Sequence, residues 1–181
     1  MQERVIYVFT YEINDLVLHL KNRFKTNNPF EIAEMCNIII RYEPLKKVKG
    51  MYTIQERCSF IILNNKLDED MERVVIFHEI GHHFLHKEYA ATAAFSEHSL
   101  CDMTSKFEVE ANTFAVNYLV EDKDIEEAAE DGYTSQQIAC SMRVPVELIM
   151  IKLKDMNDRG YDLNVAFNPR SGFLGDNERF L

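Results

Sequence analysis

The chain has 181 residues, of which 46% are hydrophobic, and a formal net charge of -10 at pH 7. This size predicts one globular domain, or one with a small appendage, that buries about 70% of its unfolded surface. The negative charge argues against broad binding to nucleic acid or to an anionic membrane. Because neither a signal segment nor a membrane-spanning run is visible, we expect a cytoplasmic protein with no membrane partner. The four cysteines lack Cys-x-x-Cys spacing, which predicts reduced thiols.

The first third of the chain predicts two helices and then three short strands. Apolar residues share one face of residues 11–25, and Pro29 introduces a second helix over residues 30–36. Segments rich in β-branched and apolar residues follow at residues 37–42, 50–55 and 59–64. They predict a small antiparallel sheet, whose exposed edge could align an extended peptide by strand addition.

The most informative motif lies in the next predicted helix, over residues 68–86. The pattern HExxH occupies residues 78–82 of this helix. Histidines four residues apart share a helix face, so His78 and His82 can reach one cation. Glu79 lies about 100° round the helix, where it can hold a water molecule without becoming a metal ligand.

This arrangement is typical of zinc peptidases, in which three protein ligands leave one metal position for water. Zinc lowers the pKa of that water to about 7, so that Glu79 can take its proton and later return it to a leaving amine. Gly81, in the middle of the helix, costs roughly 1 kcal/mol relative to alanine. We therefore expect another backbone or a ligand to come close to Gly81.

The third ligand must come from elsewhere in the chain. The long metzincin motif is excluded, because Leu85 and Glu88 occupy the positions of its glycine and its third histidine. On a straight helix His86 would lie about 12 Å from His78, too far to share one ion. We interpret His86 as a residue that supports a ligating histidine or lies at the surface.

A helix predicted over residues 107–120 supplies better candidates. Glu108 and Glu110 flank its apolar stripe on opposite sides, so periodicity does not choose between them. Asn112 lies four residues after Glu108 on the same face, where it could hydrogen-bond a ligating histidine. We therefore predict Glu108 as the third ligand of a zinc ion, with Glu110 as the alternative.

The two motifs, HEIGHHFLH at residues 78–86 and EVEANTFA at residues 108–115, resemble those of the ImmA/IrrE family of metallopeptidases. The resemblance covers roughly residues 12–155, including segments at residues 28–33 and 61–64. It departs from many relatives at the end of the second motif helix, where this chain reads YLVE in place of LLMP.

The resemblance implies a gluzincin-like zinc peptidase of the kind found in bacteria, phages and mobile elements. Such a protein cuts a transcriptional repressor, often one encoded nearby, and thereby relieves repression. His78, His82 and the first glutamate of the second motif would hold the metal, and Glu79 would be the general base.

The remaining segments predict a loop and a helical C-terminal portion. Small and polar residues at 90–102 indicate a loop near the site that could act as a lid, and we interpret its His98 as a solvent-facing residue. Residues 133–139 and 144–153 have the rhythm of a helix-turn-helix. The net charge of residues 132–154 is only +2, which favours packing on the core or docking of a substrate over DNA binding.

We therefore predict an α+β, zincin-like fold in which a small antiparallel sheet packs beside the HExxH helix. The expected divisions are a peptidase domain over residues 1–125, a helix-turn-helix-like appendage over residues 126–160 and an irregular tail over residues 161–181. The predicted function is zinc-dependent cleavage of a protein, with a helix-turn-helix repressor as the substrate that the resemblance implies. The alternatives are a non-catalytic module that sequesters a regulator and a DNA-binding regulator.

Overall fold

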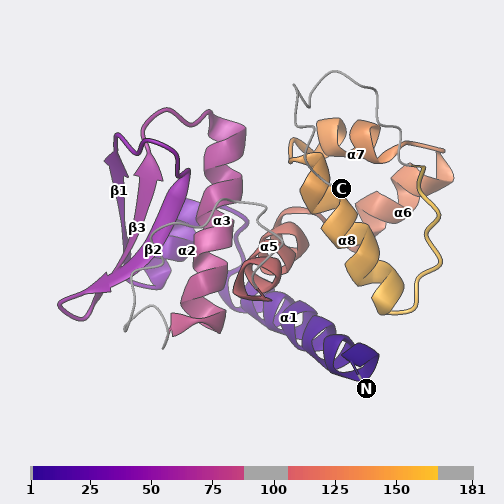
Figure 1. Cartoon of the computed structure of the whole chain (residues 1–181), viewed down its shortest axis with the longest axis horizontal. Coiled ribbons are helices and arrows are strands. Elements are labelled where there is room, and N and C mark those ends of the chain that lie inside the picture. The colour runs from indigo at the N-terminus through magenta and orange to yellow at the C-terminus, as the bar shows by residue number, and fades with distance from the viewer. Residues whose placement is uncertain (1, 88–105, 167–181) are drawn as a thin grey trace, which may run out of the picture.

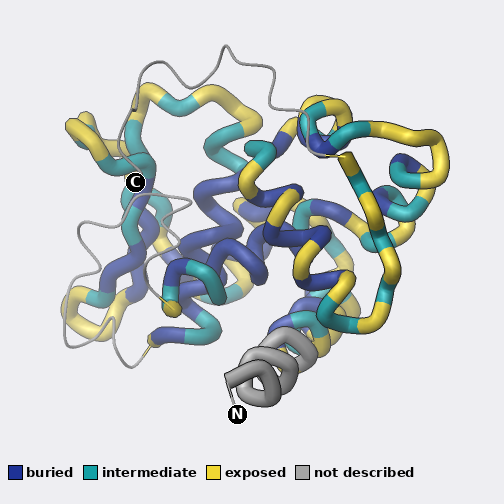
Figure 2. The backbone as a smooth tube through the Cα atoms, turned by 45° about the vertical axis from the view of Figure 1, so that its right-hand side comes forward, coloured by how far each residue is buried: buried dark blue, intermediate teal, exposed yellow. Residues whose placement is uncertain are grey.

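A computed structural model describes residues 2–87 and 106–166 of the chain, with side chains from Glu12 onward. The loop expected at residues 90–102, including His98, and most of the expected C-terminal tail lie outside the described residues. A small sheet lies at one end of the molecule and a group of helices at the other (Figure 1). Two central helices, α3 and α5, lie between them and carry much of the buried backbone (Figure 2).

The described residues form seven helices and three strands, which confirms the predicted α+β class. The helices are α1 (Gln2–Phe24), α2 (Pro29–Met35), α3 (Glu69–Leu85), α5 (Lys106–Leu119), α6 (Asp122–Glu130), α7 (Ser135–Met142) and α8 (Val146–Asp158). The strands are β1 (Ile38–Glu43), β2 (Gly50–Gln55) and β3 (Cys58–Asn64). Within the described ranges, no helix combines the length and the apolar character that crossing a membrane requires.

The sheet is mixed, so the prediction of a purely antiparallel sheet was wrong. The strand order is β1-β3-β2, with β2 antiparallel and β1 parallel to β3. Glu56 and Arg57 both have positive φ angles, and they join β2 to β3 in the tight two-residue turn that suits a twisted hairpin. The six residues between β1 and β2 instead carry the chain past β3. As a result, β1 pairs with β3, on the side of the hairpin away from β2.

Helix α3 begins and ends close to where the sequence predicts. The Asp68 side chain caps it by accepting a hydrogen bond from the Met71 backbone N–H at 2.8 Å, and acidic residues fill its first turn. Its final two-thirds is buried on nearly every face, including the polar motif. Buried polar groups need partners, so this helix must bring its own chemistry into contact with neighbouring elements.

The backbones of α3 and α5 touch at Gly81, as the position of this glycine predicts. A Cβ atom at Gly81 would lie 3.2 Å from both the Cα and the carbonyl oxygen of Ala111, and 3.2 Å from a ring carbon of Phe114. Such a distance is shorter than ordinary van der Waals contact. The absence of a side chain at Gly81 therefore sets how closely the two helices approach.

The C-terminal helices are joined to α5 by a buried ionic network. Lys152 on α8 is 1% exposed and donates hydrogen bonds to Asn117 on α5 and to Asp122 at the start of α6. Arg159 reaches both Asp122 and Asp155. Because buried charges are stable only when they are paired, this network ties the three helices to one another.

Helices α7 and α8 form the predicted helical pair, and a capping box at Thr134 and Gln137 begins the first of them. Lys152, which contributes to the +2 charge of this segment, is buried against Asp122 and so faces no solvent. Lys154 is exposed but pairs with Asp158 at the end of the same helix. The surface charge available to attract phosphate is therefore smaller than the sequence indicates.

We expect Gly81→Ala to lower the free energy of unfolding by about 1–3 kcal/mol, and Gly81→Val to lower it further, because the added carbon presses on the backbone of α5. Alanine is a better helix former than glycine by about 1 kcal/mol. At a helix position with free space around it, the same substitution would therefore raise the free energy of unfolding. Urea unfolding of the metal-free proteins measures the change. A more stable Gly81→Ala variant would contradict the close packing.

We also expect Asp122→Asn to cost about 2–3 kcal/mol, because it leaves Lys152 and Arg159 short of a counter-charge. Burial alone would raise the pKa of Asp122, but hydrogen bonds from Arg159 and Lys152 outweigh it and lower the pKa from 3.8 to about 2. This stabilisation is therefore present above pH 4 and is lost as the pH falls toward 2. Unfolding at several pH values tests it, with Glu127→Gln in an exposed pair of the same helix as the near-neutral control.

Candidate metal centre

Three buried side chains from two helices converge at the contact between α3 and α5. His78 and His82 come from successive turns of α3, and Glu108 comes from the first turn of α5. One ligand atom of each residue lies within 4.8 Å of the other two, so this group could hold a metal ion. The fold thus brings together the three residues that the sequence selects as ligands.

The distances between the donor atoms suit a single small cation. His78 Nε2 lies 3.1 Å from His82 Nε2 and 3.2 Å from Glu108 Oε2, and His82 Nε2 lies 3.4 Å from Glu108 Oε1. A tetrahedral ion with bonds of about 2.1 Å separates its ligand atoms by about 3.4 Å. Two histidines and one glutamate also form a donor set that occurs in catalytic zinc sites.

The hydrogen bonds around His78 leave donor atoms to which a cation could bind. His78 Nδ1 lies 3.0 Å from Asn112 Oδ1, which can only accept, so Nδ1 donates and the neutral ring has its lone pair on Nε2. Glu108 Oε2 is buried without a hydrogen-bond partner. A lone pair and an anionic oxygen therefore face one another, and a metal ion would satisfy both.

Glu79 lies on the same buried surface of α3 but is separate from the group of donors. Burial raises the pKa of Glu79 to about 7; His82 opposes this rise, Glu108 reinforces it, and a hydrogen bond from the backbone N–H of Tyr52 opposes it. Gly50 at the start of β2 brings the strand close, since a Cβ there would lie 3.3 Å from Glu79 Oε1. The edge strand β2 therefore borders the carboxylate.

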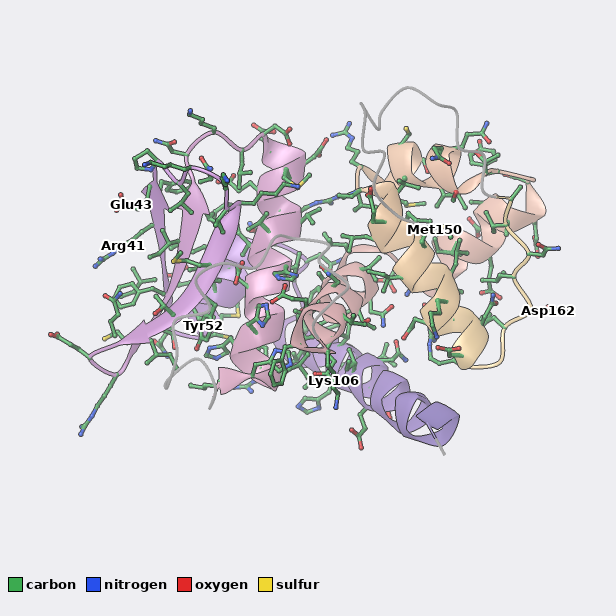
Figure 3. The ribbon with its side chains drawn as sticks, in the orientation of Figure 1. Arg41, Glu43, Tyr52, Lys106, Met150 and Asp162 are labelled. Atoms are coloured by element: carbon green, nitrogen blue, oxygen red, sulfur yellow. The ribbon has the colours of Figure 1, made fainter. Side chains whose placement is uncertain are left out.

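Tyr52 is a site residue that the sequence analysis missed. It is fully buried on β2, at the side of the sheet nearest α3 (Figure 3). Its hydroxyl lies 2.8 Å from His83 Nδ1 and 3.0 Å from Ser59 Oγ. Burial lowers the pKa of His83 to about 4, so this histidine is a neutral partner of Tyr52. The alternating pattern of residues in this strand does not indicate that the backbone of Tyr52 contacts Glu79 on a helix distant in the sequence.

Glu110, the alternative ligand, contacts another histidine. Its Oε2 lies 2.9 Å from His86 Nε2, one turn beyond His82 on α3. His86 is 2% exposed and is not one of the three converging donors. Its predicted role as a supporting residue is therefore compatible with its position, whereas a surface position is excluded.

Comparisons with known proteins agree with this geometry. A peptidase family described by its IrrE N-terminal-like domain matches residues 33–154. The chain is 35% identical to "uncharacterized immunity region protein 2" of Bacillus phage phi105, over 81% of this chain and 90% of that protein. It is also 27% identical to metallopeptidase ImmA of Bacillus subtilis (strain 168), over 72% of this chain and 78% of that protein.

We expect the purified protein to bind one divalent metal ion, and His78→Ala and Glu108→Gln each to lose it under the same conditions, because each removes one of the three donors that converge among the described residues. Elemental analysis after gel filtration measures the metal content. Glu127→Gln, in an exposed pair on α6, is the control that should keep the metal. Full occupancy in His78→Ala would contradict the site.

Proposed function

Since the chain belongs to the peptidase family defined by the IrrE N-terminal-like domain, we propose that it is a zinc-dependent endopeptidase acting on a protein substrate. The observation that supports this most directly is the convergence of His78, His82 and Glu108. Three protein ligands leave a position for a reactant, whereas structural zinc sites are closed by four. The described residues bring no fourth acidic, histidine or cysteine ligand into this group.

In the proposed mechanism, His78, His82 and Glu108 would hold the zinc ion. When bound, zinc supplies a Lewis acid that polarises the scissile carbonyl and makes water more acidic. Glu79 takes the proton from the attacking water and delivers it to the leaving amine. The backbone N–H of Tyr52 donates to the Glu79 carboxylate and so holds it in position for both transfers.

The position of β2 supports an extended peptide as the substrate. In the described sheet β2 is an edge strand, and it lies beside α3 (Figure 1). An edge strand offers unpaired backbone groups to which a peptide can add as a further strand. A peptide bound in this way would run past Glu79.

We further propose that the substrate is a transcriptional repressor with a helix-turn-helix. The two relatives carry the names of an immunity region protein and of metallopeptidase ImmA, and the motifs of this chain resemble a family that relieves repression by cleavage. Such a substrate would place the protein in the cytoplasm. The weak surface charge of α7 and α8 favours a role for these helices in packing or in substrate docking over DNA binding.

Glu79→Gln separates catalysis from binding. We expect this variant to keep its metal and its fold but to cleave about 10²–10⁴-fold more slowly, because the amide cannot accept a proton. Each protein is incubated with the repressors encoded beside its gene, and fragments are identified by mass spectrometry.

Cleavage by Glu79→Gln at the wild-type rate would contradict the mechanism. Relief of repression by Glu79→Gln without any cleavage would support the alternative, a module that binds and sequesters a regulator.

A further inference from the structure

A chain of three side chains runs from the metal centre to a carboxylate on α5. His82 Nδ1 lies 3.0 Å from His86 Nδ1, and His86 Nε2 lies 2.9 Å from Glu110 Oε2. The exposed fraction of both histidines is 2%, and that of the Glu110 side chain is 13%. All three groups are therefore largely shielded from water. In such a buried environment hydrogen bonds are stronger than in water, and an unsatisfied polar group is costly.

The carboxylate at the end of this chain fixes the direction of its protons. An ionised glutamate only accepts, so His86 Nε2 must donate to Glu110. A neutral His86 then has its lone pair on Nδ1, which accepts a hydrogen bond from His82 Nδ1. His82 consequently has its own lone pair on Nε2, the atom that lies among the metal-binding donors.

We propose that Glu110 and His86 are positioning residues, which hold His82 in the tautomer and the orientation that bind the metal. This inference rests on the proposed metal site. Hydrogen bonds behind a ligating histidine typically fix its tautomer and raise its basicity. Glu110 would thus act through two imidazole rings, without contacting the metal.

The local structure holds His86 in this place. Helix α3 ends at Leu85, and His86 is its C-cap residue, with a backbone conformation outside the helix. The ring of Phe107 packs against the ring of His86 with a centroid distance of 4.7 Å in a T-shaped arrangement. The His86 backbone N–H still donates to the His82 carbonyl oxygen, so the two rings lie one turn apart on the same face and meet through their Nδ1 atoms.

The same helix, α5, supports both ligating histidines. Asn112 accepts a hydrogen bond from His78 Nδ1. Glu110 accepts one from His86, whose other ring nitrogen accepts a hydrogen bond from His82 Nδ1. Glu108 lies between the two histidines. Glu108 is thus a proposed ligand, and two further residues of α5 support the other two ligands. Asn112 supports His78 directly, and Glu110 supports His82 through His86.

Two measurements on the full chain test the proposal. The first is metal affinity, by competition with a chromophoric zinc chelator, for the wild type, Glu110→Gln, His86→Phe and the double variant. The second is the tautomer of His82 in the metal-free protein, read from the ¹⁵N chemical shifts of its ring. Lys106→Ala is the control, since it removes the other, largely exposed partner of Glu110 and leaves His86 in place.

We expect each single variant to weaken zinc binding by about 10- to 100-fold, and the double variant to be no weaker than His86→Phe, because the two residues act through one chain. We expect His82 to have its proton on Nδ1 in the wild type and to lose this preference in Glu110→Gln. Lys106→Ala should match the wild type in both measurements.

Wild-type zinc affinity in Glu110→Gln, or an Nε2 proton on His82 in the wild type, would overturn the proposal. If Glu108→Gln loses zinc in the same assay while Glu110→Gln does not, only the positioning role fails. If neither variant changes zinc binding, the proposed metal site itself fails.

Discussion

The contact between α3 and α5 is the constraint on which the rest of the site depends. Gly81 lets the backbone of α5 approach until Ala111 touches it, and the polar residues around Ala111 then meet the histidines around Gly81. Glu108 reaches His78 and His82, Glu110 reaches His86, and Asn112 reaches His78. A wider separation would break these contacts together, because short polar side chains cannot span an added gap. The candidate metal centre is thus a property of the helix interface.

The sheet positions the base independently of the ligands. β2 packs against α3 through Gly50. Burial raises the pKa of Glu79 to about 7, and the Tyr52 backbone N–H, which donates to this carboxylate, opposes the rise. The Tyr52 hydroxyl also anchors His83. Neighbouring faces of α3 therefore contact different elements: α5 contacts the proposed ligands, and β2 contacts the Glu79 carboxylate. The strand that would guide a peptide is the strand that holds the proposed base, which couples substrate alignment to catalysis in the proposed mechanism.

The C-terminal helices are joined to the same central helix. Lys152 is buried against Asn117 and Asp122, and Asn117 lies on α5, nine residues beyond Glu108. A buried cation of this kind is retained only with its partners, so it fixes where α8 sits on α5. Its burial also removes one of the few positive charges that a DNA-binding interpretation of α7 and α8 requires. The helical pair found by its sequence pattern is thus tied to the peptidase core through an ionic contact that sequence periodicity does not reveal.

The sequence by itself determined most of the elements and selected the residues that converge at the candidate metal centre. Strand and helix bounds came within a few residues over α2, α3 and the three strands, because capping residues, β-branched runs and apolar periodicity act locally. The spacing of His78 and His82 was sufficient to place both on one face of a helix. Periodicity could not choose between Glu108 and Glu110, because both flank the same stripe. Only the packing of α3 on α5 brings Glu108 to His78 and His82 and brings Glu110 to His86. Nor could periodicity give the parallel pairing of β1 or the contact of Tyr52 with Glu79, since both depend on residues brought together from distant parts of the chain. Local interactions encode the parts, and the tertiary packing at Gly81 decides which polar groups meet.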